Sequence, residues 1–281
     1  MRKTLLQAIL AAISCVLAHA PLEGGGVMLI SLRNAFMSGT RKPSPTAKDY
    51  VQSGLSYLYD GIENAGWGQH DATQNGWVNL VDGTMPFVLT QSAETYFGLN
   101  YLHRSNTSGA LRPNFQVVEA NTTTELLVNV SADNSISDNA RFIGASITNR
   151  RFEVDCYSSG VSNAPRLYWR MTGGTSQTTT FCRFQRASAW GLWALALTVD
   201  SSGVVTVKDT TTGASWSSGT STVDVAYYVD NPAVIGCWVQ GDKVYGQMIC
   251  NIHRIARYNK VLSAEEIAHN YAIDKERFNL P

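Results

Sequence analysis

The chain has 281 residues, of which 44% are hydrophobic and 10% aromatic, so it can bury a sizeable core. Only 16% of its residues are charged, below the roughly 25% of an average soluble domain, and 22 basic residues balance 22 acidic ones without a long basic run. Nucleic-acid binding needs a basic patch for the phosphates, so this composition disfavours it. Serine, threonine, asparagine and glycine fill the polar positions instead, as is common in extracellular and virion β-proteins.

Residues 1–37 form an N-terminal segment with helical patterning and three open interpretations. A basic start, Met1 to Lys3, and an apolar run ending in Ala18-His19-Ala20 are typical of a secretory signal. Pro21 argues against a signal, because proline directly after the cleavage site generally blocks signal peptidase.

Two other interpretations of this segment stay open. Apolar residues at three- to four-residue spacing favour an amphipathic or coiled-coil helix that anchors or oligomerises the protein. Alternatively, translation starts at Met28, after the stretch Glu23–Gly26, and residues 1–27 are not translated. The spaced apolar residues are Leu6, Ile9, Ile13, Val16 and Ala20.

Residues 38–48 read SGTRKPSPTAK, a polar stretch with two prolines that predicts a linker. A single all-β sandwich often reaches about 200–250 residues, so this length needs no second domain. The globular domain is therefore expected over residues 49–281.

The first loop of this domain gathers aromatic and polar residues. Trp67, His70, Asp71 and Trp77 lie within eleven residues, after an apolar strand that ends near Asp60. An indole can stack on a pyranose ring while Asp and His hydrogen-bond to its hydroxyls, so these four are the candidate ligand-binding residues. The competing interpretation is structural: the two tryptophans plug the end of a sandwich and Asp71 caps a turn.

Short strands and turns alternate through the middle of the chain, as a β-sandwich requires. Residues 190–199 are expected to form a hairpin with Val204–Lys208 around the turn Asp200–Gly203. The other predicted strands are Phe87–Thr90, Tyr96–Leu102, Phe115–Ala120, Thr124–Val130, Arg141–Ala145, Phe152–Tyr157, Arg166–Met171 and Phe181–Arg186.

The chain ends with a strand, a turn and one helix. Val244–Tyr258 alternates apolar and polar residues as a half-buried strand does, and Asn259-Lys260 then turns the chain. Ser263 is placed to cap a helix, and Glu266, three residues later, completes a capping box.

Three features together, the strand and loop near Asp60, the hairpin at 190–208 and the capped final helix, resemble the concanavalin A-like lectin/glucanase superfamily in its laminin G-like branch. Such domains occur in surface proteins of gut bacteria and their phages, and the resemblance covers about residues 50–278. It implies an all-β, two-sheet antiparallel jelly-roll sandwich with a short C-terminal helix, here behind an N-terminal helical extension.

Members of this superfamily include β-glucanases, whose catalytic strand carries Glu-x-Asp-x-x-Glu. Phe152 begins a strand that supplies Glu153 and Asp155, but Ser158 stands where the second glutamate is needed. A retaining glycosidase requires both carboxylates, so we expect no enzymatic activity by this route.

Metal binding is an open question in the sequence. Some relatives bind calcium through loop aspartates, but no spacing singles out a cage, so calcium is an option and no cofactor is assigned. His253 and His269 are expected to be structural. The loop aspartates considered are Asp60, Asp71, Asp82, Asp200 and Asp230.

Five cysteines show no metal-ligand spacing such as C-x-x-C, and their odd number leaves at least one without an intrachain disulfide partner. We expect free thiols that act as small buried apolar groups. They are Cys15, Cys156, Cys182, Cys237 and Cys250.

The resemblance and the loop aromatics together predict a non-catalytic, lectin-like carbohydrate-binding domain displayed on a phage virion or bacterial surface. The alternative is a purely structural virion protein, such as a head-fibre or tail-appendage subunit, and a glycoside hydrolase ranks third. Expected partners are cell-surface or capsular glycans, and virion or homo-oligomeric partners through residues 1–37, at an extracellular or virion-surface location.

Overall fold

The computed structural model describes residues 44–85, 95–105, 110–131, 140–147, 150–157, 164–170, 177–181, 190–228, 233–240, 243–245 and 248–281. The statements below refer to these residues. The chain divides into residues 1–44 and a compact unit, Pro45–Pro281. The predicted N-terminal helical segment 1–37 and the predicted strand Phe87–Thr90 lie outside the described residues.

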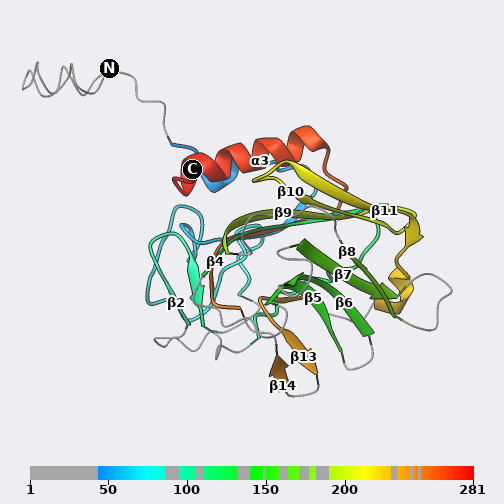
Figure 1. The fold of residues 1–281 in the computed structure, drawn as a ribbon. Helices are drawn as coiled ribbons and strands as arrows, with labels where there is room; N and C mark the ends of the chain where they lie inside the picture. Colours follow the sequence, from blue (N-terminus) through cyan, green and yellow to red (C-terminus); the bar gives the residue numbers. More distant parts are fainter. Residues whose placement is uncertain are drawn as a thin grey trace, which may run out of the picture. The chain divides into compact units, whose positions relative to one another are not determined.

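One antiparallel sheet forms the larger layer of the compact unit (Figure 1). It has eight strands within the described residues, seven in one ordered path and β1 paired separately with β15. In spatial order the path is β11 (Ala214–Thr222), β10 (Val204–Asp209), β9 (Gly191–Val199), β4 (Thr122–Val130), β15 (Cys250–Tyr258), β3 (Leu102–Arg104) and β2 (Thr95–Phe97), while β1 is Leu55–Asp60.

A second antiparallel sheet of five described strands packs against one face of the first. Its order is β12 (Ala233–Ile235), β5 (Ala140–Ile147), β6 (Arg150–Tyr157), β7 (Ala164–Arg170) and β8 (Gln177–Phe181). A small ribbon, β13 (Trp238–Gln240) with β14 (Lys243–Tyr245), and two short 3-10 helices, η1 (Ala47–Asp49) and η2 (Val225–Tyr228), complete the unit with the final helix α3 (Ala264–Arg277).

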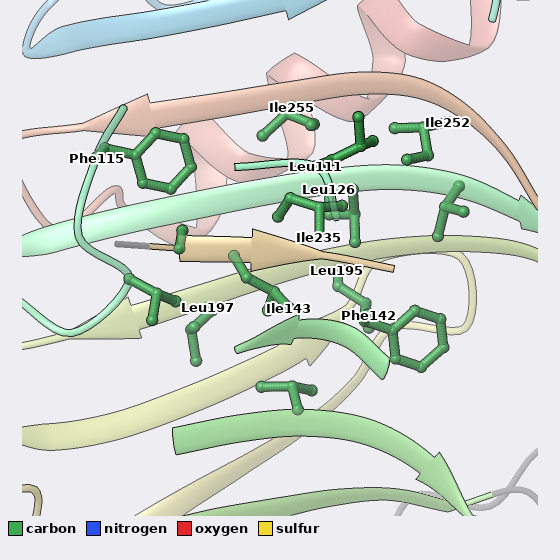
Figure 2. Packing of buried hydrophobic residues seen from close by; sticks show 14 of the residues in the cluster. Leu111, Phe115, Leu126, Phe142, Ile143, Leu195, Leu197, Ile235, Ile252 and Ile255 are labelled. Carbon is green, nitrogen blue, oxygen red and sulfur yellow. The ribbon is translucent and has the colours of Figure 1, made fainter. Parts of the chain in front are cut away.

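The main core lies between the two sheets, as a sandwich requires (Figure 2). Phe142 of the small sheet meets Trp193 of β9 with ring centroids 5.1 Å apart. Leu195 and Leu197 extend the same face of β9 into this core, while Ala194 and Ala196 pack on the opposite face beneath α3. Because both faces of β9 are covered, its sequence is apolar almost throughout instead of alternating. The predicted two-sheet antiparallel sandwich is confirmed.

The final helix begins where the capping box predicts. Ser263 Oγ accepts from the Glu266 amide at 3.2 Å, and the Glu266 carboxylate accepts from the Ser263 amide at 2.9 Å. Ile267 packs with Leu58 and Ala256 on the outer face of the large sheet, so α3 covers the face that the small sheet leaves open (Figure 1). No helix among the described residues is long and apolar enough to cross a membrane.

A β-bulge in β15 adapts this strand to the helix above it. Ile252 pairs with Val128 and Arg254 with Leu127, so His253 is an extra residue without a partner in the register. Such a bulge changes the direction in which the following side chains point. Arg254 here points away from the sandwich core and contacts Asp274 of α3.

Arg254 is the centre of a buried ionic network. Its Nε and Nη2 donate to the two carboxylate oxygens of Asp274 on α3 at 2.7 and 2.8 Å, and its Nη1 donates to Glu125 of β4 at 2.8 Å. The guanidinium lies over the Tyr50 ring at 4.6 Å, and the Tyr50 hydroxyl donates to Asp274 at 2.8 Å. Burial raises the pKa of the Glu125 carboxyl above its ordinary value, because its effect is larger than the opposing effect of the Arg254 charge.

A second buried arginine attaches the end of α3 to the start of the domain. Arg277 donates to Asp60 at 2.9 Å and contacts Glu63 at 3.1 Å. Glu63 also accepts from the amide of Ala47, which is fully buried. The compact unit therefore begins at Pro45, within the stretch 38–48 that the sequence predicts as a linker.

Two predicted strands differ in the structure. Tyr96–Leu102 is a hairpin, because Gly98 starts a turn in which its amide donates to the Tyr101 carbonyl at 2.9 Å. Phe115–Ala120 is not a strand, although Val117 and Val118 are buried in the core. A short apolar run indicates burial but does not by itself specify extended pairing.

Two further strand boundaries shift. Val244–Tyr258 contains a break, because its two halves belong to different sheets as β14 and β15. The strand predicted at Phe181–Arg186 ends at Phe181 in β8, and residues 182–189 lie outside the described residues. The remaining predicted strands through the hairpin at 191–209 are confirmed within a few residues.

We expect Arg254→Met to lower the free energy of unfolding by about 3–5 kcal/mol, because it leaves two carboxylates buried without their cation. Chemical denaturation of the full chain, followed by tryptophan fluorescence, measures this change. The matched control is Lys260→Met, which removes a half-exposed pair with Glu266 and should cost less than about 1 kcal/mol. Equal losses in the two variants would contradict a structural role for the network.

Candidate functional site

Trp77 is separated from the other three predicted ligand-binding residues. Its side chain is fully buried, its Nε1 donates to the Asp60 carbonyl at 3.1 Å, and its ring meets Tyr59 and Phe97 edge-on. An indole in this position presents no exposed face on which a sugar ring can stack.

Trp67, His70 and Asp71 lie on the first loop, and the side chains of His70 and Asp71 are already hydrogen-bonded within it. Trp67 packs partly against the cluster beneath α3, and Lys48 Nζ lies 5.5 Å from its ring. His70 Nδ1 donates to the Ile62 carbonyl at 3.1 Å. Asp71 Oδ1 accepts from the amide and hydroxyl of Thr73, so this aspartate closes a turn.

The same turn recurs at other loop aspartates. Asp82 accepts from the amide and hydroxyl of Thr84, and Asp200 does so from Ser202, each at 2.7–2.9 Å. Asp60 is instead fully buried and paired with Arg277, while Asp230 falls outside the described residues. No group of three or more His, Cys, Asp or Glu side chains in the described ranges is placed to hold a metal ion.

The two acids of the glucanase-like strand are buried in the described structure. Glu153 is 1% exposed and pairs with Arg141 at 3.2 Å, and Asp155 is 0% exposed. A buried, paired carboxylate is poorly placed to protonate or attack a sugar in solvent. Ser158 lies outside the described residues.

A row of polar and aromatic side chains crosses four adjacent strands of the large sheet. Tyr96 of β2 pairs in register with His103 of β3. His103 pairs in turn with Asn251 of β15, and Asn251 pairs with Asn129 of β4. Each residue lies between two buried neighbours in its strand, so the four point away from the sandwich core. The sheet therefore brings together residues that are up to 155 positions apart.

This row lines a pocket of about 280 Å³. The Tyr96 and His103 rings are stacked, with centroids 4.8 Å apart and planes inclined by 27°. Burial and the neighbouring Tyr96 side chain both raise the pKa of Tyr101. The lining residues are Tyr96, Tyr101, His103, Asn129, Ser131, Cys250 and Asn251.

One hydrogen bond orients two polar side chains of the pocket, His103 and Asn251. His103 Nδ1 lies 2.8 Å from Asn251 Oδ1, and an amide oxygen accepts, so Nδ1 carries the proton. The Asn251 NH₂ group is then left as a donor, and the second imidazole nitrogen is turned away from this bond. Donors held in place in this way set the orientation of a bound ligand.

Glycine allows Tyr101 to take its position. A Cβ at Gly98 would lie 2.3 Å from Cζ of the Tyr101 ring, so the ring rests directly on the turn of the hairpin. Gly61 similarly approaches the Asn100 carbonyl, where a Cβ would lie 2.5 Å away. Both close contacts leave no room for any side chain.

Aromatic contacts connect the pocket to the end of α3. The His253 ring meets Tyr101 edge-on, with centroids 6.0 Å apart, and meets Phe278 with centroids 5.3 Å apart. His253 Nδ1 also donates to the Asn100 carbonyl at 3.0 Å. The pKa of His253 is below its ordinary value, because burial lowers it more than the Asn100 carbonyl and Asp274 raise it.

The sequence pattern does not identify this pocket, because the ligand-binding residues that it predicts lie in another part of the chain. The pocket depends on strand register between β2, β3, β4 and β15, which no local pattern specifies. One signal is present: Gly98, Leu99 and Asn100 are turn-compatible residues within what reads as a continuous strand. Recognising that turn would have paired Tyr96 with His103.

Comparisons with known proteins give fold-level similarity only. No protein-family model matches the chain, and no curated protein does either. A similar solved structure is the Ruminococcus gnavus IT-sialidase CBM40 bound to α2,6-sialyllactose, with 13% identity and a TM-score of 0.40 over 57% of this chain and 96% of that one.

Larger proteins also match over part of their length. The Trypanosoma rangeli sialidase in complex with sialic acid shows 14% identity and a TM-score of 0.48, over 80% of this chain and 32% of its own. NanB sialidase from Streptococcus pneumoniae shows 15% identity and a TM-score of 0.38, over 57% of this chain and 27% of its own. The chain thus spans about a third or less of these sialidases, and similarity this low assigns neither ligand nor activity.

The buried His253 predicts a pH effect on stability. Its folded pKa is lowered by burial, so the unfolded chain binds more protons as pH falls through the unfolded value of about 6.5. The stability linked to a neutral His253 is complete above that pH and is lost below it. We expect thermal unfolding between pH 8 and pH 5 to show a steeper loss for the native chain than for His253→Asn.

The variant isolates this group because Asp60 and Glu125, whose pKa values burial raises, titrate in both proteins. A folded pKa above the unfolded one works in the opposite direction and stabilises the fold as pH falls. Parallel pH profiles for the native chain and the variant would show that His253 does not contribute.

Proposed function

We propose that this chain is a non-catalytic, lectin-like carbohydrate-binding domain whose sugar site is the pocket beside the β2–β3 hairpin. The observation that carries the proposal is the row of Tyr96, His103, Asn251 and Asn129 across four strands. It combines aromatic rings with two side-chain amides at one solvent-open depression.

These groups match the two kinds of surface on a pyranose ring. The C–H face of a sugar packs on aromatic rings, here Tyr96 and Tyr101, while hydroxyl groups both donate to and accept from amides. Asn129 is exposed and Asn251 has its NH₂ group available, so both are placed for such bonds. The volume of about 280 Å³ is just below the range usual for small-molecule pockets, about 300 to 1,000 Å³. The pocket therefore suits one sugar unit.

The site is also built on rigid elements. Three of the four residues in the row lie on strands inside the large sheet, and Tyr101 is held by Gly98 and His253. A preformed site loses little conformational entropy on binding, which matters for weak ligands such as monosaccharides.

The absence of catalysis is part of this proposal. It is supported by the pairing of Glu153 with Arg141 and by the burial of Asp155, which withdraw the glucanase-like carboxylates from solvent. Display on a phage virion or bacterial surface, with partners engaged through residues 1–37, is proposed from the serine- and threonine-rich composition and the laminin G-like resemblance. No calcium site is assigned, and the binding experiment below compares binding with and without calcium.

We expect Tyr101→Ala and Asn129→Ala to weaken glycan binding by the full chain at least about tenfold, since each removes a contact worth roughly 1–2 kcal/mol. A glycan array that includes sialyllactose identifies the ligand, and titration calorimetry with and without calcium measures the affinity. Asn259→Ala is the control, because Asn259 is an exposed asparagine that directly follows β15, at the opposite end of this strand from Asn251.

Trp67→Ala distinguishes the two candidate sites. A folded Trp67→Ala protein that loses binding, while Asn129→Ala retains it, would move the site to the loop of Trp67, His70 and Asp71. Absence of binding to any glycan by the folded native chain would overturn the lectin proposal and favour the structural virion role.

A further inference from the structure

We infer that the pocket beside the β2–β3 hairpin selects uncharged sugars and rejects sugars that carry a carboxylate, sulfate or phosphate. This inference rests on the proposed function and adds the chemical class of the ligand. It is carried by the charges around the pocket.

No lining residue of this pocket, among those described, is a lysine, arginine, aspartate or glutamate. Recognition of a sugar carboxylate usually relies on a guanidinium or ammonium group, which forms short charge-assisted hydrogen bonds. The pocket offers amides, hydroxyls and one imidazole. The side chain of Cys250 is buried in the main core and points away from the pocket.

The two arginines nearest in the strands are committed elsewhere. Arg104 directly follows His103 but points to the opposite face of the sheet, where it is fully buried and donates to the Ile235 carbonyl at 2.6 Å. Arg254 is held by Asp274 and Glu125 beneath α3. Neither can turn its guanidinium toward a ligand without abandoning buried partners, which is strongly unfavourable.

The sequence next to the lining residues adds negative rather than positive charge. The segments that adjoin them along the chain, 86–94, 106–109, 132–139 and 246–247, contain no lysine or arginine. The same segments contain Glu94, Asp133 and Asp138. An anionic sugar in this pocket would lack a counter-charge among the described lining residues, and an uncompensated charge at a binding site costs affinity.

Matched pairs of sugars test the inference without a change of ring. Methyl galactoside and methyl glucoside differ from the methyl glycosides of galacturonic and glucuronic acid only in the oxidation of C6 to a carboxylate. Saturation-transfer NMR and calorimetry with the full chain at pH 8 compare each neutral glycoside with its uronide. We expect the uronides to bind at least about tenfold more weakly than their neutral partners.

A variant that adds a positive charge to the pocket tests the same inference from the protein side. Asn129→Lys places an ammonium group at the exposed end of the row and should raise uronide affinity at least about threefold, while Asn259→Lys, with the same charge placed elsewhere, should not. The two hypotheses fail differently. Tighter binding of uronides by the native chain overturns the uncharged-ligand inference and leaves a lectin, whereas no binding of either class, here and on the array, overturns both.

Discussion

The structure depends on one electrostatic constraint, the burial of the Arg254 guanidinium between the large sheet and α3. A buried cation is tolerated only when its charge and all its donors are matched, and here Asp274 and Glu125 supply the match from two different elements. Since the three groups satisfy one another in one arrangement, the helix has little freedom to slide or rotate on the sheet. The apolar contacts of Ile267 add stability, but they are less specific about register.

This constraint reaches the candidate site through neighbouring residues. The bulge at His253 lets β15 present both His253 and Arg254 toward the helix. Fixing α3 fixes Phe278, which packs on His253, and His253 in turn packs on Tyr101 at the pocket. The pocket residue Asn251 and the buried Arg254 are therefore only three positions apart on β15, with His253 between them. A change in helix packing has a short physical path to the pocket, with rings in direct contact at each step.

Local chemistry could be predicted from the sequence, and strand register could not. Ser263 and Glu266 are three residues apart, so the capping box and its helix follow from their spacing alone. The hairpin around Asp200 and the all-β class were accessible for the same reason. The pocket requires knowing that residue 251 lies between residues 103 and 129, and this pairing is decided by the whole sheet. Trp77 shows the related difficulty that an aromatic residue reads alike whether its ring is buried or exposed.

The aspartate-closed turns have a consequence for how the loops can evolve. In each, one carboxylate oxygen binds the amide and hydroxyl two residues later, so the turn is complete within three residues. The residue enclosed by each turn, Ala72, Gly83 or Ser201, is exposed. Such loops keep their shape without help from neighbouring loops. Substitutions at Ala72 and Ser201 can therefore change the outward chemistry of these loops one position at a time while the sandwich beneath stays the same. Gly83, with a φ of +74°, favours glycine and is the exception.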